Sequence, residues 1–160
     1  MNVTIRRAVP ADYEAICELA EIMDAPQRGA LPDRFRKPEG PVRLRNRTEA
    51  LMRDRDTFLA VAEIDGRVVG VVNAGLEQMP DYPQKQPLTS VLVRGISVRA
   101  DCRRQKVGTT LINAAIAWAR SRGAVEAQAN VYDFNQPAAA FFASLGLAPL
   151  SHRLVRRLHP

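Results

Sequence analysis

The stretch SVRADCRRQKVGTTLINAAIAWARSRG, residues 97–123, contains the pattern that decides the fold. A strand-like run ends at Val98, basic residues then surround a turn, and apolar residues recur at helical spacing from Gly108 onward. The first N–H groups of a helix have no partner inside the helix and lie at the positive end of its dipole, so they bind anions. The stretch therefore predicts a strand, an anion-binding turn and a helix in immediate succession.

Patterns on both sides of this stretch predict further strands and helices. Strands are expected over residues 3–8, 57–64, 67–78, 88–98, 124–132 and 147–158, and helices over residues 10–23, 42–53, 108–122 and 135–146. Residues 24–41, rich in Pro, Gly and Arg, are expected to form a loop or a broken helix. Asp65-Gly66 predicts a tight hairpin, and Gly95 predicts a bulge or a close backbone approach. This order indicates a mixed sheet flanked by helices, with its parallel pair in residues 88–132.

Length and composition set the bounds of the function. The 160 residues suit one domain, and the net charge of +6 with a pI near 10.0 indicates an anionic partner. Nucleic acid, a membrane surface and a phosphorylated cofactor all meet that description. No apolar run has the length of a membrane span and no signal-peptide pattern is present, so a cytoplasmic location is expected. The two cysteines match no metal or redox spacing, and no metal site is expected.

A second motif follows the basic turn at a defined distance. Arg103 and Gly108 occupy the first and last positions of an R/Q-x-x-G-x-G/A turn, and residues 135–147 read NQPAAAFFASLGL. In the second stretch Asn, Ala, Phe and Gly follow the spacing Asn-x-x-Ala-x-x-Phe-Tyr-x-x-x-Gly-Phe. With both motifs in this order, the chain resembles the GNAT superfamily of N-acetyltransferases over nearly its whole length.

The resemblance implies a fold and an assembly. It implies one domain over residues 1–160, of the α/β (α+β) class, with a mostly antiparallel central sheet of six to seven strands and about four helices. A bulge near Gly95 would splay the two parallel strands and leave room for a cofactor arm. The family often forms dimers, so a homodimer is expected, without a nucleic-acid or membrane partner.

The resemblance also implies acetyl-CoA as co-substrate. The strand residues Ile96, Ser97 and Val98 would offer backbone hydrogen bonds to the pantetheine arm. The pyrophosphate would lie against Arg103, Arg104, Gln105, Lys106, Val107, Gly108, Thr109 and Thr110, with Asn135 and Phe142 also beside the cofactor.

Two residues depart from the family pattern. Lys106 replaces the first glycine of the turn, which leads us to expect a turn without a positive φ at this residue. Phe142 stands where many members carry the tyrosine that protonates the leaving thiolate, and phenylalanine cannot do this. The thiolate would then be protonated by a different acid or by water, or catalysis would depend mostly on positioning of the reactants.

The catalytic candidates are few. The strand over residues 88–98 contains no carboxylate where relatives often place a glutamate, and Arg94 lies there instead. Glu77, at the end of the preceding strand, is then the nearest expected base, directly or through water, although an exposed strand-end glutamate is an equally simple interpretation. Tyr132 would approach the thiol, or merely pack. Two neighbouring arginines would lower the pKa of Cys102, but a structural role for this cysteine is favoured.

A basic segment, with seven Arg and Lys side chains between residues 28 and 47, would shape the acceptor pocket in this family. It suggests an acceptor with a carboxylate or phosphate, and a solvated basic surface explains it equally well.

Three functions remain open. The leading one is transfer of an acetyl group to a primary amine of a small molecule or peptide in a ternary complex. The others are a non-catalytic acyl-CoA-binding protein and a basic nucleic-acid-binding domain, the last supported by charge alone.

Overall fold

The computed structural model describes residues 2–158. It separates into two units, Met1–Asn130 and Val131–Pro160, which are described one at a time. In the first unit a sheet has the order β1-β2-β3-β4-β5, with bounds Thr4–Arg7, Thr57–Ile64, Arg67–Gln78, Thr89–Val98 and Glu126–Ala129. The first four strands pair antiparallel, and only β4 and β5 are parallel. The mixed, mostly antiparallel sheet is therefore confirmed.

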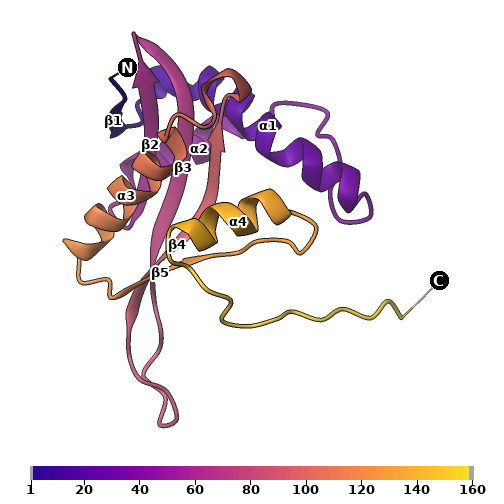
Figure 1. Cartoon of the computed structure of the whole chain (residues 1–160), viewed down its shortest axis with the longest axis vertical. Coiled ribbons are helices and arrows are strands. Elements are labelled where there is room, and N and C mark those ends of the chain that lie inside the picture. The colour runs from indigo at the N-terminus through magenta and orange to yellow at the C-terminus, as the bar shows by residue number, and fades with distance from the viewer. Residues whose placement is uncertain (1, 159–160) are drawn as a thin grey trace. The chain divides into compact units, whose positions relative to one another are not determined.

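Helices cover both faces of the sheet (Figure 1). The first turn, η1 (Pro10–Asp12), leads into α1 (Tyr13–Ala30), which is followed by α2 (Arg45–Arg53). Apolar side chains of α1 and α2 pack on one face around Leu59, Val61 and Val71. On the other face, α3 (Val107–Arg120) packs closely on β3, since a Cβ at Gly70 would lie 3.0 Å from Leu111 and 3.3 Å from Val107.

The tight hairpin and the bulge are both where the sequence predicts them. Asp65 and Gly66 join β2 to β3 with positive φ values of 49° and 78°, which matches the conformation of a two-residue hairpin turn. In the pairing of β3 with β4, Asn73 faces Gly95 and Ala74 faces Val93, so Arg94 is the extra residue of a bulge. A Cβ at Gly95 would lie 3.0 Å from the Met23 sulfur, so α1 approaches the backbone at this bulge.

The parallel pair splays after the bulge. β5 pairs with β4 only from Ser90 to Val93, while β4 continues to Val98. In the described part of the chain, no strand pairs with residues 94–98 on that side. The backbone groups on this edge of β4 are thus left for another partner.

An ion-pair cluster joins the start of α1 to the sheet. The Asp12 carboxylate accepts two hydrogen bonds from Arg6, at 2.7 Å and 2.9 Å, and one from the Val9 N–H at 2.8 Å. Arg6 also donates to Glu63 of β2 at 3.0 Å. The hydrogen bonds from Arg6 hold the pKa of the buried Asp12 carboxyl below its ordinary value.

Two sequence predictions about the elements need correction. The sequence predicts a loop or a broken helix over residues 24–41, but α1 continues through Pro26 as far as Ala30, and the loop begins only after it. Local Pro and Gly signals are overridden here because Met23 packs at the bulge and Asp24 binds Arg43 of the following loop. No strand forms over residues 147–158, so the sheet has five strands within the described residues 2–158 rather than the six to seven predicted. The leucines at 150, 154 and 158 are 85%, 91% and 82% exposed, so the segment buries no apolar face that would stabilise a strand.

The second unit contains α4 (Gln136–Ser144). Asn135 is the N-cap, and its side-chain carbonyl accepts a hydrogen bond from the Ala138 N–H at 3.2 Å. The helix is followed by Gly146 with a φ of 87°, as predicted for a glycine that ends a helix. Between residues 2 and 158, no helix combines the length and the apolar character required to cross a bilayer.

Candidate functional site

The basic turn leads directly into the N-terminus of α3. The helix begins at Val107, one residue earlier than expected, and its first intrahelical hydrogen bond runs from Thr110 N–H to the Lys106 carbonyl at 2.9 Å. The N–H groups of Val107, Gly108 and Thr109 therefore have no acceptor inside the helix. Among the described residues, no side chain caps them. These three N–H groups, at the positive end of the helix dipole, can bind an anion.

Side chains of the turn divide into those that hold it together and those that remain at its surface. Arg103 donates to the Val98 carbonyl at 3.3 Å, and Gln105 donates to the Asp101 carbonyl at 3.2 Å. The Thr110 hydroxyl donates to the Lys106 carbonyl at 3.0 Å, so its proton is used within the helix. Arg104 and Lys106 are exposed. They are the cations of this turn best placed to meet a bound phosphate.

The backbone of this turn corrects one prediction. Lys106 has a φ of 63°, in the left-handed region, although we expected no positive φ there. Arg104 has the same φ. A side chain in this conformation costs roughly 1–2 kcal/mol because the Cβ crowds the carbonyl oxygen. The turn therefore has a glycine-like backbone conformation at Lys106 and carries a charged side chain there.

Two substitutions at Lys106 separate its charge from its backbone conformation. Lys106→Ala and Lys106→Gly both remove the ammonium group, but only glycine adopts a positive φ without crowding. We expect the glycine variant to be the more stable of the two by about 1 kcal/mol, measured by chemical denaturation. Equal stabilities would contradict the assigned conformation.

Cys102 lies in η2 (Ala100–Cys102), just before the turn. Burial, followed by the nearby Asp101 carboxylate, raises the pKa of its thiol. This is the reverse of the lowered pKa that its two arginine neighbours suggest, because burial and the Asp101 carboxylate outweigh the opposing effect of the nearby cations Arg67 and Arg99. A protonated thiol is a poor nucleophile, which agrees with a structural role.

The edge of β4 lies next in the chain before this turn. Ile96, Ser97 and Val98 belong to the unpaired part of the strand, as described above. The Ser97 side chain is buried, and its hydroxyl has no hydrogen-bond partner among the described residues. Ser97 is paired with Val71, whose side chain packs with α1, so this hydroxyl lies on the α1 face of the sheet and not at its edge. It is the unpaired backbone N–H and C=O groups of residues 96–98 that suit the edge to a ligand with polar groups.

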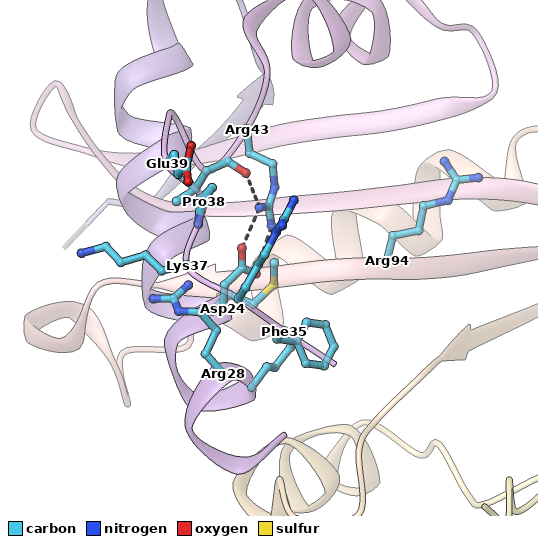
Figure 2. Close-up of a pocket in the computed structure, with 12 residues that line it drawn as sticks. Asp24, Arg28, Phe35, Lys37, Pro38, Glu39, Arg43 and Arg94 are labelled. Atoms are coloured by element: carbon cyan, nitrogen blue, oxygen red, sulfur yellow. Dashed lines mark hydrogen bonds and ion pairs between the residues drawn. The ribbon is translucent and has the colours of Figure 1, made fainter. Parts of the chain in front are cut away.

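A large cavity lies beside α1 and the loop that follows it (Figure 2). Its volume is about 720 Å³. Arg43 closes part of the wall by a two-pronged ion pair with Asp24, at 2.7 Å and 3.1 Å. The Tyr13 hydroxyl donates to the Arg43 carbonyl at 2.6 Å and ties the loop back to α1. The lining residues are Met23, Asp24, Gln27, Arg28, Phe35, Arg36, Lys37, Pro38, Glu39, Val42, Arg43 and Arg94.

A smaller cavity of about 120 Å³ adjoins the large one and shares Met23, Arg43 and Arg94 with it. Asn73 of β3 also lines it, and the Asn73 side-chain oxygen is buried without a hydrogen-bond partner in the described structure. Sequence reasoning missed this residue. The signal was present, since Asn73 is the one amide in the otherwise apolar run VVGVVNAGL of β3.

Glu77, the predicted base, lies near the end of β3 and is exposed. Asn73, Gly75 and Glu77 share one face of the strand, because side chains alternate. The Arg94 guanidinium covers Gly75 and occupies the space that a Cβ would need there. Four residues separate Glu77 from Asn73, roughly 13 Å along the strand, and Glu77 lines neither cavity. Its role as a base stays a prediction.

The remaining predicted residues belong to the second unit. The Asn135 carbonyl caps α4, which leaves its NH₂ group as the donor for a ligand. Tyr132 is 43% exposed and stacks on Phe134 with a centroid distance of 5.8 Å. Phe142 is buried and packs against Phe141. These roles at the cofactor and in catalysis likewise stay predictions.

Comparison with known proteins gives one family. The model of the acetyltransferase (GNAT) family matches residues 19–147. A probable N-acetyltransferase of Xenopus laevis, camello, is 39% identical over 72 residues, which make up 45% of this chain and 30% of camello. The matched part is thus less than a third of that relative.

Solved structures resemble the whole chain. A mutant of the Bacillus halodurans protein BH1408 has a TM-score of 0.88 at 25% identity, covering 98% of this chain and 99% of the other. An aminoglycoside antibiotic 6′-N-acetyltransferase, AAC(6′)-Ih of Acinetobacter baumannii, has a TM-score of 0.77 at 15% identity, covering 99% of both chains. The second likeness is one of fold alone.

Proposed function

Because the chain belongs to the GNAT acetyltransferase family, we propose that it is an N-acetyltransferase. It transfers the acetyl group of acetyl-CoA to a primary amine of a small molecule or a peptide, by direct attack in a ternary complex. One observation carries this proposal: the edge of β4 left unpaired by the splayed strands runs directly into the anion-binding turn at α3. One continuous segment thus offers polar backbone to an extended arm and N–H groups to a pyrophosphate.

The residues present fit acetyl-CoA. The Val107, Gly108 and Thr109 N–H groups would hold the pyrophosphate, with Arg104 and Lys106 adding positive charge. The unpaired backbone edge at residues 96–98 would bind the pantetheine arm as an added strand binds. Acetyl-CoA supplies a thioester, whose acyl carbon accepts an amine without an acyl-enzyme.

The chain's own contribution to the reaction is mainly positioning. Fixing an amine next to a thioester replaces a bimolecular encounter and contributes several kcal/mol on its own. Glu77, directly or through water, is the proposed acceptor of the amine proton, and Tyr132 the proposed group near the thiol. Phe142 has no acidic proton, so the thiolate would take its proton from another group or from water.

The wider setting is also proposed. The two units act as one acetyltransferase domain, supported by a family match that extends across the boundary at residue 130. A homodimer is supported by the exposed leucines at 150, 154 and 158, which a second copy would cover. The cytoplasm, which contains acetyl-CoA, is the proposed location.

Two measurements test the proposed activity. Calorimetric titration with acetyl-CoA should show binding at micromolar concentrations, and thiol release should rise when a suitable amine is added. Absence of acetyl-CoA binding would overturn the proposal. Binding without thiol release, across amino acids, amino phosphates, polyamines, aminoglycosides and peptides, would instead favour an acyl-CoA-binding protein that does not catalyse transfer.

A further inference from the structure

The large cavity has an excess of positive charge. Five cationic side chains and two carboxylates line it. Two of the cations are neutralised locally: Arg43 by Asp24 in the wall, and Arg28 by an ion pair with Glu21 of the same helix. Because these pairs cancel, the charge of the cavity depends on the side chains that remain.

Three lining cations, Arg36, Lys37 and Arg94, form no ion pair with another described residue. Arg36 and Lys37 belong to the loop after α1, whereas Arg94 is the bulge residue of β4 and its guanidinium lies over Gly75. Figure 2 shows Lys37 and Arg28 on the α1 side of the cavity and Arg94 apart from them. Glu39 is the one lining carboxylate outside the ion pair between Asp24 and Arg43. The loop side of the cavity is therefore a cationic surface facing an open volume.

Such a surface would favour some amine acceptors over others by their charge. An amine that also carries a carboxylate or phosphate gains attraction and charge-assisted hydrogen bonds from Arg36 and Lys37. A polycationic amine meets like charges instead, which disfavours it by electrostatic repulsion. Aminoglycosides are polycations, so the aminoglycoside acetyltransferase that shares this fold is a poor guide to the acceptor here.

The adjoining small cavity would hold the amine end of an acceptor that also carries a carboxylate or phosphate. It lies at the β4 bulge and is lined mostly by apolar side chains of α1, α2 and the sheet, together with Asn73, Thr48 and the two shared arginines, of which Arg43 is paired with Asp24. The unsatisfied Asn73 oxygen can accept a hydrogen bond from an amine N–H. An acceptor with its anion near Arg36 and Lys37 would thus direct its amine toward the unpaired segment of β4.

On these grounds we infer that the acceptor is a primary amine bearing an anionic group, either carboxylate or phosphate, which the loop cations Arg36 and Lys37 recognise. The inference rests on the proposed function, because the cavity is an acceptor pocket only if the chain is an N-acetyltransferase. The charge preference of the cavity can nevertheless be measured without any turnover, so the two proposals fail separately.

The first experiment uses two probes of equal length and opposite charge. Glutarate and pentane-1,5-diamine are titrated by calorimetry into the protein saturated with CoA, which occupies the pyrophosphate turn. We expect glutarate to bind more tightly than the diamine, and the double variant R36Q/K37Q to weaken glutarate binding by about tenfold or more. The control variant Arg120→Gln removes a cation from the last turn of α3 and should leave glutarate binding unchanged.

The inference is overturned if glutarate does not bind, if the diamine binds more tightly, or if R36Q/K37Q and Arg120→Gln give the same affinity. Unchanged melting temperatures of the variants show that lost binding is not lost folding. If CoA itself does not bind, the proposed function fails. The charge preference is then still tested by titrating glutarate into wild type and R36Q/K37Q without CoA.

The second experiment compares amines that differ only in the anionic group. Thiol release from acetyl-CoA is measured with β-alanine against propylamine, with O-phosphoethanolamine against ethanolamine, and with kanamycin. Higher kcat/KM for the anionic member of a pair, lost in R36Q/K37Q, supports the inference and shows whether carboxylate or phosphate is preferred. Higher kcat/KM for kanamycin or for the neutral-tailed amines overturns it while leaving the acetyltransferase activity established.

Discussion

Replacing Asp12 by alanine is expected to lower the free energy of unfolding by about 3 kcal/mol at pH 7. The substitution removes the acceptor of two Arg6 hydrogen bonds and of the Val9 N–H. Asp12 itself is buried, but the Arg6 side chain is 35% exposed. The expected loss is therefore at the low end of the range for breaking a buried ion pair. Chemical denaturation followed by circular dichroism measures it.

The same variant has a defined pH dependence. Hydrogen bonds from Arg6 hold the Asp12 pKa below its ordinary value of 3.8 in the folded protein. A lowered folded pKa means that the unfolded chain takes up the proton first as the pH falls. The stabilisation is therefore complete above the unfolded pKa and is lost as the pH falls from there through the lower folded pKa, so the difference between wild type and Asp12→Ala should shrink as the pH falls below about 3.8.

Glu63→Ala is the matched control for Asp12→Ala. Glu63 binds the same arginine through a single carboxylate oxygen and is more exposed than Asp12. Its loss should cost about 1 kcal/mol or less. Equal costs for the two variants, or a cost for Asp12→Ala that persists unchanged at low pH, would show that Asp12 does not hold α1 through its charge.

Replacing Gly108 by leucine should change stability and cofactor binding in opposite directions. Residue 108 is helical, in the first turn of α3, and leucine has a higher helix propensity than glycine. The free energy of unfolding should therefore rise by up to about 1 kcal/mol. The added side chain would stand among the N–H groups proposed for the pyrophosphate. We therefore expect acetyl-CoA affinity to fall by about tenfold or more.

Two comparisons isolate the cause of this loss. Acetylpantetheine lacks the pyrophosphate, so its affinity should be the same in wild type and Gly108→Leu. Gly29→Leu makes the identical change in the last turns of α1, where a Cβ meets no atom within 4 Å, and should leave acetyl-CoA affinity intact. Unaltered acetyl-CoA affinity in Gly108→Leu would remove the turn from the cofactor site.

What the sequence alone determined about this protein is mainly local. The Asp65-Gly66 hairpin, the Asn135 cap, the glycine that ends α4 and the strand-turn-helix at α3 all lie where their residues predict them. Each of these depends on the conformational preferences of a few neighbouring residues, which act before any tertiary contact forms. Their order along the chain was also enough to indicate the family, which the comparison confirmed.

Only the tertiary structure decided the rest. The continuation of α1 through Pro26 depends on contacts with Gly95 and Arg43, far along the chain. Which cations of the basic segment are neutralised, and that Asn73 lies unsatisfied beside them, follows from the folding of the loop against α1 and β3. A sequence shows how many charges a segment carries, but their pairing is set by distances between residues remote in the chain, because electrostatic interaction depends on separation and burial.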